Sequence, residues 1–141
     1  MPDIEVSTTI NASVEKVWEC LIDIESWRHW WPGHKLQKVD PAWQEGGKLV
    51  WKTGRPSTIN SFTSPTYFQW MDMNMGIEIY RSFRLEVVDQ GSTKIIHDLK
   101  IIGASFPPGG EAQERNDMVA TLSKIRNLAE KGQTKWWEFW K

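Results

Sequence analysis

Two runs of alternating residues near the middle of the chain constrain the fold more than any other feature. In residues 77–88, one face carries apolar side chains except for Arg81, and the other face is mostly polar. Residues 94–102 alternate in the same way, with His97 as the polar exception on the apolar face. Period-two alternation is typical of strands with one buried face. Because turn-forming residues 89–92 join the runs, we expect an antiparallel hairpin whose apolar faces lie together.

The segments on either side of this hairpin predict an α+β domain. The expected elements are a strand at 3–10, an amphipathic helix that begins after Asn11 or Ser13, a short helix at 24–30 that ends at Trp31-Pro32-Gly33, about six strands between Lys35 and Ile102, a loop at 103–110 and a helix at 111–131. Strands joined by short turns form an antiparallel meander. A curved sheet packed against the final helix would bury both apolar surfaces.

Length, charge and cysteine content exclude several classes of protein. A chain of 141 residues is the size of one domain. Its net charge is −1, from 17 basic and 18 acidic residues, so no basic field would attract nucleic acid. A single cysteine excludes an internal disulfide, and with no signal sequence and no apolar run of membrane-spanning length we expect a cytoplasmic protein.

The chain resembles a known superfamily at both ends of the predicted domain. The segment INASVEKVWECLIDIESWRHWWPG and the strand GSTKIIHDLKIIG resemble the START-like superfamily, also called SRPBCC or helix-grip proteins, and in particular its polyketide cyclase/dehydrase and lipid-transport-like branch. The resemblance covers residues 3–131. It implies a helix-grip fold, in which a sheet of about seven strands wraps a long C-terminal helix, with two short helices after strand one. It also implies a deep apolar cavity between the sheet and that helix, which many members use for hydrophobic ligands and a minority for catalysis.

The polar residues on the predicted inner face are the candidate binding groups. The hairpin places His97 near Arg81, and the preceding strand is expected to bring Trp70 and Asp72 beside Arg81. One interpretation is a polar patch that holds the carboxylate of an amphipathic ligand. The alternatives are a buried Arg81–Asp72 pair with a structural role, or catalysis with His97 as general acid or base.

From these observations we expect a domain at 1–132 that binds a lipid, polyketide or isoprenoid-like molecule, without cofactor or metal, in a cavity of roughly 300–1,000 Å³. Alternatives are a cyclase/dehydratase-type enzyme using the same cavity and a chaperone-activator-like interaction module. The expected ligand-binding residues are Trp30, Trp51, Phe68, Trp70, Asp72, Ile79, Arg81, Phe83, His97, Leu99, Phe106, Met118 and Leu122.

The last residues, 133–141, form a separate tryptophan-rich tail. If the tail is helical, its aromatic residues share one face and its charged residues the other. Such a segment could extend the preceding helix, dock on the domain, pair with a second copy or contact a membrane surface. The aromatic residues concerned are Trp136, Trp137, Phe139 and Trp140.

Overall fold

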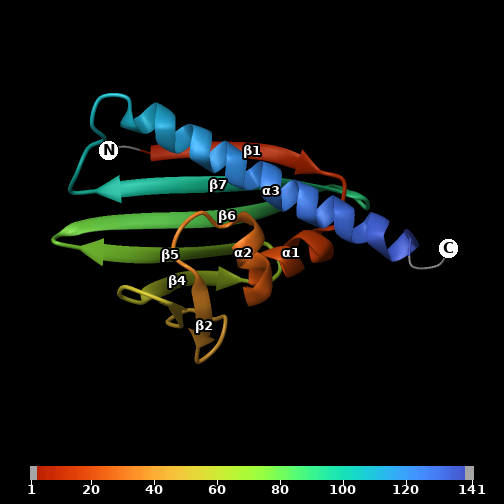
Figure 1. Cartoon of the computed structure of the whole chain (residues 1–141), viewed down its shortest axis with the longest axis horizontal. Coiled ribbons are helices and arrows are strands. Elements are labelled where there is room, and N and C mark those ends of the chain that lie inside the picture. The colour runs from red at the N-terminus through yellow and green to blue at the C-terminus, as the bar shows by residue number, and fades with distance from the viewer. Residues whose placement is uncertain (1–2, 139–141) are drawn as a thin grey trace.

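A computed structural model describes residues 3–138, and the side chains of residues 3–131. The elements in chain order are β1 (Asp3–Ile10), α1 (Val14–Ile22), a 3₁₀ turn (Ile24–Ser26), α2 (Trp27–Trp30), β2 (Leu36–Asp40), β3 (Lys48–Trp51), β4 (Ser57–Thr63), β5 (Tyr67–Asn74), β6 (Ile77–Asp89), β7 (Ser92–Ile102) and α3 (Gly110–Glu138). The predicted α+β class and element order are confirmed. The three helices lie on the same side of the sheet, with α3 running across it (Figure 1).

The seven strands form one antiparallel sheet in the order β1-β7-β6-β5-β4-β3-β2. Phe83 on β6 pairs with His97 on β7, and Trp70 on β5 pairs with Arg81 on β6. This register confirms the predicted hairpin and the predicted position of Trp70 beside Arg81. A shift of one residue would turn each inner side chain to the opposite face, so the register determines that Arg81 and His97 lie on the same side of the sheet.

Helix α1 begins where its sequence predicts. The hydroxyl of Ser13 accepts a hydrogen bond from the backbone N–H of Lys16 at 3.3 Å, which satisfies one of the free donors of the first turn. Val17, Trp18 and Leu21 of this helix are buried against the sheet. Its amphipathic pattern therefore specifies both its start and its packing face.

Tryptophan rings fill the space between the short helices and the sheet. Trp27 and Trp30 are each 1% exposed, and their ring centroids lie 4.6 Å apart. Their indole N–H groups donate to the carbonyl oxygens of Leu21 at 2.7 Å and Cys20 at 3.1 Å. These carbonyls belong to the last turn of α1, where no further helical N–H is available. The rings thus fill the core and complete the end of α1.

Helix α3 is longer than the predicted 111–131. It continues through Gly132 to Glu138, because one glycine costs a helix only about 1 kcal/mol. Met118, Leu122, Ile125 and Ala129 form its buried stripe. The side chains of Trp136, Trp137, Phe139 and Trp140 lie outside the described residues. Within residues 3–138, no helix is both long and apolar enough to cross a bilayer.

Candidate functional site

A small pocket lies between α3, the end of α2 and the inner face of the sheet. Its volume is about 150 Å³. The residues that surround it come from four separate parts of the sequence and are Trp31, Pro32, Gly33, Arg81, His97, Glu114, Asp117, Met118 and Thr121. The pocket combines an aromatic wall with ionisable groups, so it is the best candidate site in the described part of the chain.

Arg81 forms an ion pair with α3. Its Nη2 lies 2.9 Å from Oε1 of Glu114, and the two side chains are 21% and 22% exposed. The guanidinium carbon also lies 5.5 Å from the centre of the Trp31 ring, a cation–π distance. The predicted pair between Arg81 and Asp72 is wrong, because the long arginine side chain reaches away from the sheet to the helix. Asp72 instead accepts a hydrogen bond from the hydroxyl of Ser57.

His97 is the buried polar group of the pocket. It is 1% exposed, and its ring stacks on Phe83 with a centroid distance of 4.2 Å. Nδ1 lies 2.9 Å from the backbone oxygen of Ser82, which can only accept, so Nδ1 carries the proton. Burial lowers the pKa of His97 to about 3, with a smaller contribution in the same direction from Arg81. The ring is therefore neutral at physiological pH, and Nε2 is its remaining acceptor.

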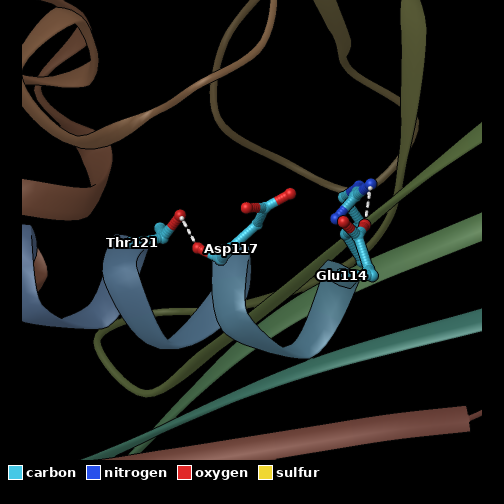
Figure 2. Close-up of polar contacts among 4 residues, drawn as sticks. Glu114, Asp117 and Thr121 are labelled. Atoms are coloured by element: carbon cyan, nitrogen blue, oxygen red, sulfur yellow. Dashed lines mark hydrogen bonds and ion pairs between the residues drawn. The ribbon is translucent and has the colours of Figure 1, made fainter. Parts of the chain in front are cut away.

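One face of α3 supplies the other polar groups. Figure 2 shows Glu114, Asp117 and Thr121 along the same side of the helix, as expected for residues three and four positions apart. The Thr121 hydroxyl donates to the backbone oxygen of Asp117 at 3.0 Å. The Asp117 side chain is exposed at the rim of the pocket and accepts from Gln113 at 3.0 Å.

Trp31 forms the wall between this pocket and a second one. The second pocket, of about 240 Å³, shares Trp31 and Gly33 with the first. A Cβ atom at Gly33 would lie only 2.7 Å from Nε1 of Trp31, so glycine is what lets the ring occupy this position. Nε1 of Trp31 is buried without a hydrogen-bond partner among the described residues. The ring is thus held by packing and by the Arg81 guanidinium over it, without a hydrogen bond.

The remaining predicted site residues lie elsewhere. Only Arg81, His97 and Met118 line this pocket. Trp30, Trp51, Phe68, Trp70, Phe83, Leu99 and Leu122 are packed in the core, Ile79 and Phe106 lie partly buried against it, and Asp72 lines a separate pocket with His34 and Thr53. The pocket is also smaller than the predicted 300–1,000 Å³. Both differences have one cause, because the rings expected to line a cavity pack against each other instead.

Sequence reasoning missed Glu114, Asp117 and Thr121 as site residues. A signal for two of them was present. Glu114 and Thr121 stand four residues before and three residues after Met118, so they continue the buried stripe of α3 with polar groups. A polar residue on such a stripe indicates a polar partner on the opposing sheet.

Solved structures of similar shape show the same fold. CalU16 from Micromonospora echinospora is 15% identical with a TM-score of 0.68, and the alignment covers 89% of this chain and 73% of CalU16. The Aha1 dimer from Colwellia psychrerythraea is 21% identical with a TM-score of 0.67, and the alignment covers 92% of this chain and 97% of the Aha1 chain. A norcoclaurine synthase from Thalictrum flavum, solved with a transition-state analogue, is 12% identical with a TM-score of 0.61. The alignment covers 94% of this chain and 96% of the synthase.

Sequence comparison is more specific than these structural likenesses. A search of curated proteins finds no match. A family profile described as "Polyketide cyclase / dehydrase and lipid transport" matches residues 1–130, which is almost the whole globular part of the chain. The motifs of the first strand, of α1 and of β7 lie inside the matched region. The chain therefore belongs to the polyketide cyclase/dehydrase and lipid transport family of SRPBCC proteins.

Proposed function

We propose that this protein binds a small amphipathic molecule in the pocket between α3 and the sheet. The observation that carries the proposal is the convergence of Arg81, His97 and Glu114 on a space whose other walls include Trp31 and Met118. Small-molecule sites combine an apolar lining with a few placed polar groups. The family description, which names polyketides and lipids, supports a ligand with a large apolar part.

The volume of the pocket limits what can enter without rearrangement. A space of about 150 Å³ is similar to an engineered cavity, also about 150 Å³, that holds one benzene molecule. A lipid, polyketide or isoprenoid of full length needs more room. The adjacent pocket behind Trp31 supplies it only if that ring moves. The pocket therefore suits one ring or a short chain, with any remaining part of the ligand outside.

Binding fits the chemistry of the site better than cyclase/dehydratase catalysis. A general base works best when its pKa lies near the operating pH. Burial lowers the pKa of His97 to about 3, so its neutral ring is a weak base. Nε2 of His97 is better suited to accept a hydrogen bond from a ligand. The chaperone-activator-like alternative stays a prediction.

Native mass spectrometry of the protein purified from cells tests the proposal. Thr121→Phe would fill the pocket, because Thr121 is buried in its wall. Ser123→Phe adds the same ring on the exposed side of α3 and is the matched control. We expect a small molecule to co-purify with the native chain and with Ser123→Phe but not with Thr121→Phe. An unliganded native chain, or equal occupancy in all three, would contradict the proposal.

A further inference from the structure

The side chains around the pocket carry more negative than positive charge. Arg81 contributes one positive charge, whereas Glu114 and Asp117 contribute one negative charge each. His97 contributes none at neutral pH, since burial lowers its pKa to about 3. The lining therefore has a net charge of −1. Glu114 is paired with Arg81, but within residues 3–131 Asp117 has no ion-pair partner.

This charge distribution disfavours an anionic ligand. A carboxylate placed beside Arg81 would also approach the carboxylates of Glu114 and Asp117, and like charges brought together oppose binding. Arg81 already donates to Glu114 at 2.9 Å. The predicted function of Arg81 as a clamp for a carboxylate therefore does not fit its surroundings.

The unused hydrogen-bonding groups favour a donor on the ligand. His97 is 1% exposed, its Nδ1 is bonded to Ser82, and its Nε2 has no partner among the described residues. The carboxylate of Asp117 and the lone pairs of the Thr121 hydroxyl are further acceptors. An ammonium group has three N–H donors and no acceptor. The Arg81 guanidinium already lies 5.5 Å from the centre of the Trp31 ring, so this ring offers the ligand an apolar wall.

We infer that the pocket selects a small organic ammonium ion, whose nitrogen lies between Asp117 and His97 and whose apolar group lies against Trp31 and Met118. The inference rests on the proposed function, because it names the class of ligand for the same pocket. Asp117 is exposed at the rim, so water and salt screen its charge. The contribution of this ion pair to affinity should be roughly two- to fivefold.

Titration calorimetry with three probes of nearly equal size tests the inference. The probes are benzylammonium, benzyl alcohol and benzoate, used at neutral pH and low ionic strength. We expect the native chain to bind benzylammonium more tightly than benzyl alcohol, and benzoate least. Asp117→Asn should weaken benzylammonium binding roughly two- to fivefold and weaken benzyl alcohol binding less. Glu111→Gln, on an exposed position of the same helix, is the matched control and should change neither.

A second variant tests the same electrostatic argument in the opposite direction. Glu114→Gln combined with Asp117→Asn changes the net charge of the lining from −1 to +1 and leaves Arg81 without its carboxylate. Benzoate should then bind more tightly than benzylammonium. Thermal melting checks that each variant is folded.

The two possible failures can be told apart. If benzyl alcohol binds the native chain as tightly as benzylammonium, the pocket binds ligands without charge selection, and only this inference is wrong. If benzoate binds best, the inference is also wrong. If none of the probes binds, the pocket is not a ligand site of this size, and the proposed function is contradicted as well.

Discussion

Replacing Trp30 by alanine should create a cavity the size of one indole ring between α2 and the sheet. Trp30 is 1% exposed, and its ring packs against Trp27 at 4.6 Å and Phe83 at 5.5 Å between centroids. The variant also removes the donor that satisfies the carbonyl of Cys20. If the rings fill the space that would otherwise be a ligand cavity, added indole should bind in the vacated position.

The expected effects can be calculated from general measurements. A buried tryptophan replaced by alanine lowers the free energy of unfolding by about 3–5 kcal/mol. For a chain of this length, 1 kcal/mol corresponds to roughly 3 °C in Tm, so the Tm should fall by roughly 9–15 °C. Indole at one hundred times its dissociation constant would restore about 2.7 kcal/mol, which is most of a loss of about 3 kcal/mol and about half of a loss of about 5 kcal/mol.

Scanning calorimetry with and without indole measures both effects. Trp43→Ala is the control, because Trp43 is only half-buried and packs on Phe68 at the edge of the same cluster. Its removal should cost less and should not be reversed by indole. If indole raised the Tm of Trp30→Ala no more than that of the native chain or of the control, the vacated position would not be a binding cavity.

Three further predictions concern the wall of the pocket, the buried histidine and the start of α1. Gly33→Ala should displace the Trp31 ring, because the new Cβ would lie 2.7 Å from its Nε1. The indole N–H resonance of Trp31 should therefore move in a nitrogen-15 NMR spectrum, and an unmoved resonance would disprove the contact. The native chain should lose stability as the pH falls from 6.5 towards 3, by up to about 1.4 kcal/mol per pH unit, because unfolded histidine binds a proton in this range and buried His97 does not. Urea denaturation at pH 7 and pH 5 should show a smaller loss in His97→Gln than in the native chain, and equal losses would contradict this assignment. Ser13→Ala should lower the free energy of unfolding by about 1 kcal/mol, because the hydrogen bond to Lys16 is lost. Ser123→Ala is the control and should not lower it. Equal denaturation midpoints for the two variants would exclude a capping role for Ser13.

The proximity of Arg81 and His97 in the central hairpin could be predicted because period-two alternation leaves few registers. Arg81 and His97 are polar residues on apolar faces, and either hairpin register brings them close together. The observed pairs, Phe83 with His97 and Trp70 with Arg81, agree with that prediction. Contacts between residues on neighbouring strands can therefore be predicted from the sequence.

The partner of Arg81 could not be predicted in the same way. Glu114 lies on α3, and the position of a helix along a sheet depends on how all the side chains between them pack. The strand pattern places Asp72 close to Arg81, whereas no sequence pattern places α3 along β6. The pocket volume cannot be predicted for a similar reason, since the rotamers of Trp27 and Trp30 decide whether a ring lines a cavity or fills it.

The position of Trp27 at the centre of the tryptophan cluster affects how the protein absorbs and emits ultraviolet light. Its ring centroid lies between 4.6 and 6.0 Å from those of five other tryptophans, namely Trp30, Trp31, Trp43, Trp51 and Trp70. Electronic excitation passes readily between indoles at such separations, so light absorbed by one ring is shared among them. A shift of Trp31 alone would alter the near-ultraviolet circular dichroism and the emission of the whole group. The spectra of these tryptophans are thus an intrinsic probe of any movement of the Trp31 wall of the pocket.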